Sequence, residues 1–411
     1  MIKYHKFTLD NGLTVIHHED KSTQLCVLNI LYKVGSKHES SEKTGFAHLF
    51  EHLMFEGSAH VTEFDRELQI AGGESNAFTS NDLTNYYLSL PHNNIETGFW
   101  LESDRMFGLD FSEEALSVQK SVVIEEFKER YLNQPYGDIW LKLLPLAYKV
   151  HPYMWPTIGK EISHIENATL NDVKSFFSNF YRPNNAVLVV AGNISLSDTK
   201  TLSEKWFGPI SSGEIKLKHY KPEPQQLEPR LLEVREKVPL DLIVKAYHIP
   251  ERLNDDYYAC DLISDILGGG KSSRFYNELV KKEKIFIELD AYLSGDTEPG
   301  LFIVEGKLAP GISFEDADRY VTQELVKIKS GIDSAELAKV INKTEANISF
   351  GNVNVLNKAM KLAYAEYLGD LKLVNTELEK YQQVTVQQIK SNAEAVFTSN
   401  NCSTIFYHAE S

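Results

Sequence analysis

The stretch GFAHLFEHLMFEG, at residues 45–57, predicts the element around which this chain is organised. Its apolar residues recur at helical spacing, and Gly57 is a typical helix end. His48 and His52 stand four residues apart, so their imidazoles leave one helix face a single turn apart. Two such nitrogens can bind one Zn²⁺. Glu51 lies beside them, where it can act as general base toward a water molecule that the metal activates.

The composition is that of an ordinary globular protein with more than one domain. With 411 residues the chain exceeds one typical hydrophobic core, and we expect two to three domains. Hydrophobic residues make up 42% and charged residues 24%, as in most globular chains. The net charge of −16 argues against a nucleic-acid partner, because nucleic acids are bound by basic patches.

The cysteines and the N-terminus bear on the compartment. Cys26, Cys260 and Cys402 are far apart and in no C-x-x-C pattern, so we expect buried, reduced thiols and a reducing compartment. The N-terminal residues lack the apolar region of a signal peptide, and no 18-residue apolar run occurs. These features predict no membrane span and a cytoplasmic location, or a periplasmic one if a signal peptide has been removed.

A polar segment divides the sequence into two similar halves. Residues 211–230 contain three prolines and show no apolar periodicity, as in a linker. We expect an N-terminal zinc-binding catalytic domain at 1–213, a linker at 214–230 and a homologous C-terminal substrate-binding or structural domain at 231–411. Both halves run strands, helix, strands, long helices and a final strand. The predicted class is α+β, with two homologous α/β domains, each a mostly antiparallel sheet with helices packed on one face.

A catalytic zinc site needs a third protein ligand, because such sites combine three ligands with a water molecule. The segment VVIEEFKER, at residues 122–130, supplies two candidates on a predicted helix. Glu126 stands four residues after Val122 and three after Val123, which places it toward the apolar helix face. Glu125 is the alternative, and periodicity favours Glu126 without excluding it.

Several segments spread over nearly the whole chain together resemble one enzyme family. The chain is similar to the pitrilysin/insulysin (inverzincin) zinc metallopeptidases, in the bacterial two-domain branch related to the mitochondrial processing peptidase. The inverted motif followed by a paired-glutamate helix is specific to that family. The segments that carry the resemblance are HLFEHLMFEGS at 48–58, GGESNAFTSNDLTNYYLSLP at 72–91, VVIEEF at 122–127, TIGKEISHI at 157–165, FYRPNNAVLVVAGNI at 180–194 and ILGGGKSSRFYNELV at 266–280.

The resemblance implies a role for each residue of the motif. It implies His48, His52 and Glu126 as zinc ligands, since the second of the two adjacent glutamates is the ligand in related enzymes. Glu51 would be the general base that activates the water molecule.

The resemblance also implies that residues 76–79 form an edge strand to which an extended peptide substrate adds. Asn76, Ala77, Phe78 and Thr79 would bind substrate, with Asn76 and Ala77 near the scissile bond.

Two departures from the family pattern stand out. Gln119 occupies a place where family members often carry a further glutamate; its amide can hydrogen-bond but cannot compensate the charge of the metal. Val280 and Ile287 occupy the places of an Arg/Tyr pair that stabilises the oxyanion, and neither can donate a hydrogen bond. We therefore expect a heterodimer with a homologous subunit that supplies the Arg and Tyr; a homodimer is the alternative.

The sequence therefore predicts a zinc-dependent endopeptidase subunit that hydrolyses peptides by a metal-activated water, with Glu51 as general base and with activity that depends on a partner. The alternative is a non-catalytic structural or assembly subunit of the same fold. The intact set His48, Glu51, His52 and Glu126 argues against that alternative.

Overall fold

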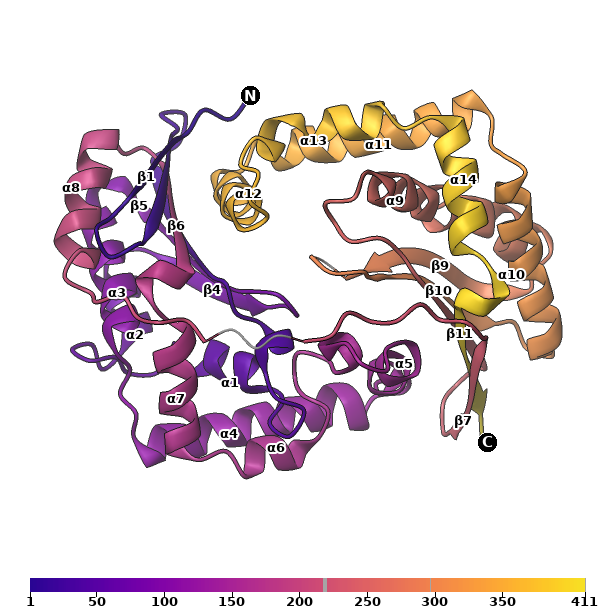
Figure 1. The fold of residues 1–411 in the computed structure, drawn as a ribbon, viewed down its shortest axis with the longest axis horizontal. Coiled ribbons are helices and arrows are strands. Elements are labelled where there is room, and N and C mark those ends of the chain that lie inside the picture. The colour runs from indigo at the N-terminus through magenta and orange to yellow at the C-terminus, as the bar shows by residue number, and fades with distance from the viewer. Residues whose placement is uncertain (217–219, 296, 411) are drawn as a thin grey trace. The chain divides into compact units, whose positions relative to one another are not determined.

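The computed structural model describes residues 1–216, 220–295 and 297–410, which form two compact units (Figure 1). Unit 1 comprises residues 1–129, 155–220 and 349–375, and unit 2 comprises 130–154, 221–348 and 376–411. The chain passes from unit 1 to unit 2 after Tyr220, inside the predicted linker at 214–230. The domain ranges 1–213 and 231–411 stay predictions, since each unit also takes a segment from the other half of the sequence.

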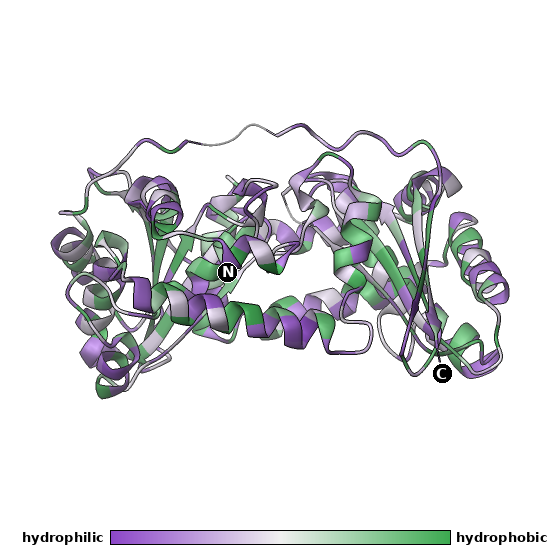
Figure 2. Ribbon diagram, turned by 90° about the horizontal axis from the view of Figure 1, so that it is seen from below, coloured by the Kyte–Doolittle hydropathy of each residue, from purple (hydrophilic) through white to green (hydrophobic). Residues whose placement is uncertain are grey.

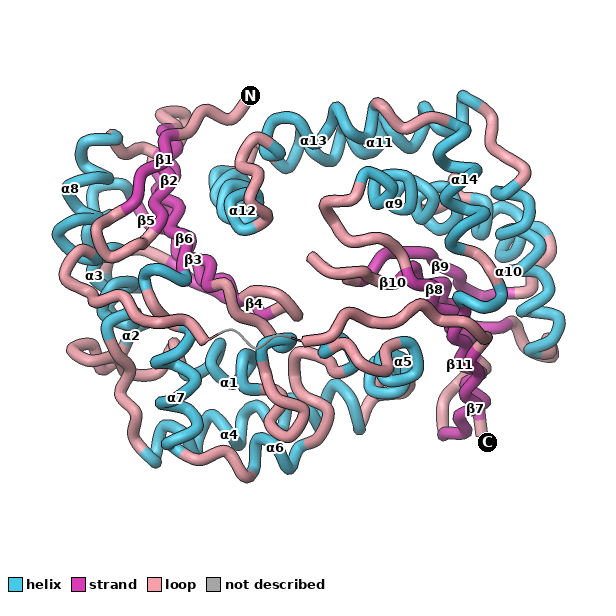
Figure 3. Tube along the Cα trace, viewed as in Figure 1, coloured by secondary structure: helices cyan, strands magenta, loops and turns pink. Residues whose placement is uncertain are grey.

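Unit 1 is built on a six-stranded sheet in the order β1-β2-β6-β3-β5-β4 (Figure 3). Its strands are β1 (His5–Thr8), β2 (Thr14–Glu19), β3 (Leu25–Tyr32), β4 (Glu74–Thr79), β5 (Thr84–Pro91) and β6 (Ala186–Gly192). The β2–β6 pair is parallel and the other pairs are antiparallel. Among the described residues β4 pairs with β5 alone, so β4 is an edge strand, as predicted for residues 76–79.

Helices cover this sheet. Those of the first half are α1 (Phe46–Leu53), α2 (Phe64–Ile70), α3 (Ile95–Phe107), α4 (Glu113–Phe127), α6 (Ile162–Glu166), α7 (Leu170–Phe180) and α8 (Leu196–Phe207). On the other face lies α12 (Val355–Tyr367), whose Ala359, Leu362 and Ala363 pack against Val27 and Val189 of the sheet. Burial of these apolar side chains stabilises the unit by about 25 cal/mol per Å² removed from water.

Unit 2 repeats the order of five of these strands, β2-β6-β3-β5-β4, without a counterpart of β1 among the described residues. Its sheet runs β7-β11-β8-β10-β9, with β7 (Arg230–Glu236), β8 (Leu242–His248), β9 (Phe286–Ser294), β10 (Leu301–Leu308) and β11 (Cys402–Ala409). The β7–β11 pair is parallel, like β2–β6, and β9 is an edge strand among the described residues, like β4. This correspondence confirms the predicted fold class of two related, mostly antiparallel α/β halves.

The helices of the second half, together with α5, complete the secondary structure. They are α5 (Ile139–Ala147), α9 (Asp255–Gly268), α10 (Phe314–Lys329), α11 (Ser334–Gly351), α13 (Leu373–Gln382) and α14 (Val386–Val396). Purple and green alternate along many helices in Figure 2, as expected of helices with one buried face. Among the described residues, no helix has both the length and the apolar character that crossing a bilayer requires.

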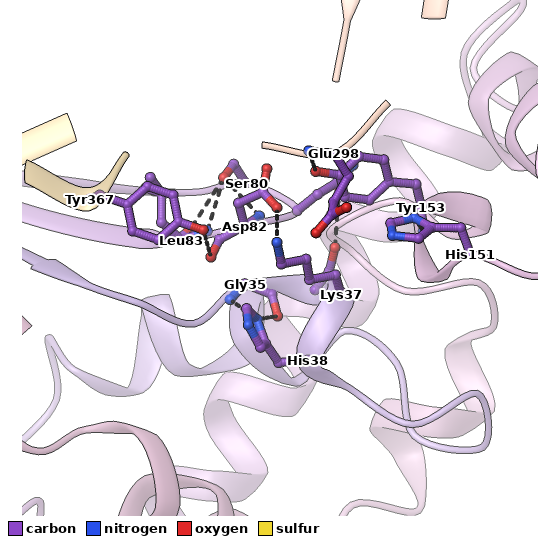
Figure 4. A network of polar contacts seen from close by, with 12 residues as sticks. Gly35, Lys37, His38, Ser80, Asp82, Leu83, His151, Tyr153, Glu298 and Tyr367 are labelled. Atoms are coloured by element: carbon purple, nitrogen blue, oxygen red, sulfur yellow. Dashed lines mark hydrogen bonds and ion pairs between the residues drawn. The ribbon is translucent and has the colours of Figure 1, made fainter. Parts of the chain in front are cut away.

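A buried ion pair joins two loops of unit 1 next to the edge strand (Figure 4). Lys37 Nζ lies 2.6 Å from Asp82 Oδ1, with side chains 6% and 0% exposed. Burial is the largest single influence and lowers the pKa of the Lys37 ammonium, but Asp82 together with nearby tyrosine hydroxyls outweighs it, so the pKa is raised. The backbone N–H of Lys37 also donates to the carbonyl of Asn81 at 2.9 Å. The loop after β3 and the loop after β4 are thereby held together.

We expect Asp82→Asn to lower the free energy of unfolding by about 3–5 kcal/mol, because it removes the carboxylate that pairs with the buried Lys37 charge at 2.6 Å. Urea denaturation followed by circular dichroism measures this loss. The matched control is Glu96→Gln, which breaks the exposed Lys205–Glu96 pair and should cost about 0–1 kcal/mol. Equal losses in the two variants would contradict the structural role of the buried pair.

Candidate metal centre

The helix α1 begins where the backbone requires a glycine. Gly45 has φ of +88°, and a Cβ at this position would lie 2.6 Å from the carbonyl oxygen of Ile158. A residue with a side chain would therefore be both strained and blocked. His48 follows three residues later, so the start of α1 sets the position of the first predicted ligand.

The buried carboxylate of Glu39 binds the first turn of α1. Its Oε2 accepts a hydrogen bond from the N–H of Gly45 at 2.9 Å, and its Oε1 accepts one from the N–H of Ala47 at 2.8 Å. Burial raises the pKa of Glu39 to about 8, although these backbone donors oppose the shift. Helix N-termini leave N–H groups without helical partners, and Glu39 satisfies two of them. No periodicity predicts this contact, which joins a residue of the preceding loop to N–H groups six and eight residues later.

The buried face of α1 packs on aromatic side chains of unit 1. Phe50 stacks on Tyr181 with ring centroids 5.0 Å apart, and the hydroxyl of Tyr86 donates to the carbonyl of Phe50 at 3.2 Å. His48 and His52 project from the partly exposed side, with ring centroids 4.8 Å apart. These contacts anchor α1 on the face opposite to its two histidines.

The helix α4 carries Glu126 to the histidines. Ser112 caps α4, its Oγ accepting from the N–H of Ala115 at 3.1 Å. Glu126 Oε2 lies 3.6 Å from His48 Nε2 and 3.4 Å from His52 Nε2.

The structure separates the two rival glutamates. The Glu125 carboxylate accepts from Lys128 Nζ at 2.7 Å, and its side chain is 72% exposed. The structure therefore brings Glu126, and not Glu125, beside the two imidazoles.

These three side chains suit a divalent metal ion. One ligand atom from each of His48, His52 and Glu126 lies within 4.8 Å of the other two, and no other such group occurs among residues 1–216, 220–295 and 297–410. Zinc binds nitrogen and oxygen at about 2.0–2.2 Å in a tetrahedron, whose corners are then about 3.3–3.6 Å apart. The His–Glu separations of 3.4 and 3.6 Å match that geometry. Two imidazoles and one carboxylate also form a donor set typical of catalytic zinc.

Glu51 stands on α1 between these ligands and the edge strand β4. Thr79 Oγ1 donates a hydrogen bond of 2.6 Å to Glu51 Oε2. Along β4 the exposed residues Asn76 and Phe78 alternate with the half-buried Ala77 and Thr79. The four predicted substrate-binding residues are thus brought to the edge strand next to Glu51, with Thr79 on the side of the base.

Gln119 lies on α4 two turns before Glu126. Its Nε2 donates to Glu56 Oε1, so this amide bonds a carboxylate that follows His52 by four residues. Glu56 was not among the predicted site residues. It follows His52 by four residues, but α1 ends at Leu53, so Glu56 lies beyond the helix that carries the histidines. A glutamate at position 119 would face Glu56, and the amide avoids that repulsion.

Val280 and Ile287, which occupy the positions of the family's Arg/Tyr pair, lie in unit 2. Val280 belongs to the π-helical turn η6 (Phe275–Lys282) and packs partly buried against the unit 2 core. Ile287 is exposed on β9. Tyr292, on the same strand, donates its hydroxyl to Glu305 at 2.7 Å. The hydrocarbon side chains at 280 and 287 have no N–H or O–H group and therefore cannot donate a hydrogen bond.

Comparisons with family models and with curated proteins point to the same protein family. The model described as insulinase, peptidase family M16, matches residues 14–148, and the model described as the peptidase M16 inactive domain matches residues 167–344. The zinc protease PqqE of Helicobacter pylori is 30% identical over 98% of this chain and 92% of its own length.

Solved structures agree with the fold over the whole chain. A protease from Helicobacter pylori superposes with a TM-score of 0.94 at 29% identity, covering 99% of this chain and 100% of that one. A protein from Pseudomonas fluorescens, described as a peptidase M16 inactive domain, has a TM-score of 0.88 at 18% identity over 100% of this chain and 98% of that one. At that identity the second likeness shows the fold alone.

We expect Gln119→Glu to lower the unfolding free energy of the metal-free protein by about 1–3 kcal/mol, because the new carboxylate loses the amide donor and faces Glu56. Denaturation in the presence of a chelator measures the change. In the Glu56→Gln background the same substitution should be nearly neutral, since the amide at position 56 can donate to the carboxylate at 119. An equal loss in both backgrounds would show that the two side chains are not coupled.

Proposed function

This chain belongs to the M16 peptidase family, that of insulinase and pitrilysin, and on that premise we propose that it is a zinc-dependent endopeptidase subunit. One observation carries the proposal: His48, His52 and Glu126 converge from two helices, with Glu51 on the same helix as both histidines. The relative PqqE is named a zinc protease, which supports zinc as the ion. His48, His52 and Glu126 would hold it.

The side chains divide the reaction between them. When bound, zinc supplies Lewis-acid chemistry, which acidifies a water molecule and polarises a peptide carbonyl. Glu51 accepts a proton from the attacking water molecule while the water oxygen forms a bond to the carbonyl carbon. Glu51 then gives this proton to the amine nitrogen as the C–N bond breaks, which leaves a carboxylate and a free amine.

The edge strand β4 offers a place for the substrate. Its outer N–H and C=O groups have no strand partner among the described residues, so an extended peptide can add there as a further strand. Asn76 and Phe78 would contact alternate substrate side chains, while the backbone of Ala77 would pair with the substrate near the scissile bond. The carboxylate of Glu51 lies beside the end of this strand. A strand-like substrate would thereby run past the general base.

A partner subunit completes the proposal. Val280 and Ile287 cannot donate hydrogen bonds to an oxyanion, and a second copy of this chain would bring the same two residues. A heterodimer with a homologous subunit that carries Arg and Tyr therefore fits better than a homodimer. The family model described as an inactive domain, over residues 167–344, agrees with a second half that lacks catalytic groups.

A non-catalytic structural role is the alternative. It is favoured by the missing donors at 280 and 287, but it leaves the converging ligands and the adjacent Glu51 unexplained. For the compartment, the free, buried Cys26, Cys260 and Cys402 support a reducing one, and we propose the cytoplasm.

We expect Glu51→Gln to keep about one zinc per chain and to lower kcat by about 10²–10⁴-fold, because the amide cannot accept the proton of water. His48→Ala and Glu126→Ala should instead lower the zinc content. Metal analysis and cleavage of a fluorogenic peptide on the same samples separate the two effects. Wild-type rates for Glu51→Gln would remove Glu51 as the base, and full zinc content in a ligand variant would remove that ligand.

We also expect the zinc-loaded chain alone to cleave peptides slowly, and to gain activity when a homologous subunit with the Arg/Tyr pair is added, because that pair supplies the missing oxyanion donors. Peptide cleavage before and after mixing the purified chains measures the gain. Mixing with the same partner after its Arg is replaced by Ala is the control. Full activity of the chain alone, abolished by a chelator, would contradict the need for a partner.

A further inference from the structure

The last residue of the edge strand touches the proposed general base. Thr79 ends β4, and its Oγ1 lies 2.6 Å from Glu51 Oε2. That separation is typical of an O–H group donating to an ionised carboxylate, the stronger class of hydrogen bond. Both side chains are partly buried, so water competes weakly for the contact. The bond joins two residues that are 28 positions apart in the sequence and belong to different elements.

The contact restricts the orientation of the Glu51 carboxylate through one of its oxygens. A threonine hydroxyl has one hydrogen, and here it is donated to Oε2. Threonine is also stiff about χ1, because two heavy atoms on Cβ restrict its rotamers. A glutamate side chain, in contrast, has several rotatable bonds and loses much freedom when it is fixed. The stiffer residue therefore holds the more flexible one.

We propose that Thr79 is a positioning residue for Glu51: its hydroxyl fixes the orientation of the Glu51 carboxylate through Oε2, and its place at the end of β4 links substrate addition to alignment of the base. This proposal rests on the proposed peptidase function. Residues that hold a group beside a metal centre affect activity about 10–100-fold when they are replaced.

The backbone of β4 connects the position where a peptide can add with the Thr79 hydroxyl. Thr79 pairs with Thr84 on β5, and the preceding residues of β4 pair with β5 along its length. A peptide added on the free edge of β4 gives this strand a second set of backbone hydrogen bonds, which restricts its motion. Since the Thr79 hydroxyl belongs to the same strand, the carboxylate it holds becomes restricted as well. Base and substrate are then ordered by one element.

The simpler explanation is that Thr79 only stabilises the strand, since β-branched residues favour strands in general. Two substitutions separate the explanations. Thr79→Val keeps the shape and the β-branch but removes the hydroxyl, whereas Thr79→Ser keeps the hydroxyl and removes the β-branch. A strand-stabilising role is retained better by valine, and a positioning role is retained better by serine.

The test compares Thr79→Val, Thr79→Ser and Thr14→Val, the last of which changes a half-buried strand threonine of β2. We expect Thr79→Val to lower kcat about 10–100-fold with KM and zinc content unchanged, and Thr79→Ser and Thr14→Val to stay near the wild-type kcat. Crystal structures of the metal-free proteins give a second readout that does not depend on activity. In Thr79→Val the Glu51 carboxylate should leave its position beside residue 79, and in Thr79→Ser it should remain there.

An unchanged kcat in Thr79→Val, or a Glu51 carboxylate that keeps its position in that variant, would overturn the proposal. A loss shared equally by the valine and serine variants would assign Thr79 to strand stability and overturn it too. Failure of the peptidase function would look different. The wild type and Glu51→Gln would then show the same rate of peptide cleavage. In that case the crystal structures still decide whether the Thr79 hydroxyl holds Glu51.

Discussion

The buried carboxylate of Glu39 is the contact on which the candidate metal centre depends. Its carboxyl oxygens accept hydrogen bonds from the N–H groups of Gly45 and Ala47 at the start of α1. His48 is in the first turn of that helix, so any shift of the helix start moves a predicted ligand. Metal coordination tolerates displacements of only about 0.2 Å. A carboxylate out of water is costly, and its pKa of about 8 records that cost. The burial of Glu39 is therefore unfavourable in itself, but it fixes the start of α1.

Periodicity within one element was readable from sequence, and contacts between elements were not. The spacing of His48 and His52 predicted their common face, because an α-helix repeats locally. Glu126 was favoured through Val122 and Val123, yet Val122 is 43% exposed and Val123 alone is buried, so half of that argument did not hold. The bonds of Glu39 to α1 and of Thr79 to Glu51 depend on how separate segments meet. The helix α5 was not predicted, since Pro145 lies inside it and interrupts a short apolar pattern.

The two sheets share one strand order but carry different chemistry. β4 and β9 take the same edge position, and each follows the same sequence of pairings. Beside β4 lies the partly buried Glu51, held by a hydroxyl, whereas β9 presents Ile287, Glu288 and Asp290 to solvent. The family fold is therefore a scaffold present twice, and the candidate site depends on residues that only one copy has. A change of a few side chains on a common strand order separates the half that carries the candidate site from the half that does not.

The place of α12 in unit 1 has a consequence for how the protein is made. The sheet of unit 1 has all its strands by residue 192, yet the face that packs on Ala359, Leu362 and Ala363 stays uncovered until α12 has left the ribosome. At about 5–20 residues per second, synthesis of the intervening chain takes of order ten seconds. During that interval Val27, Val189 and their neighbours are open to water or to chaperones. Translation that stops early thus yields a chain that carries the histidine motif but has an incomplete core, which exposes the truncated product to proteolysis.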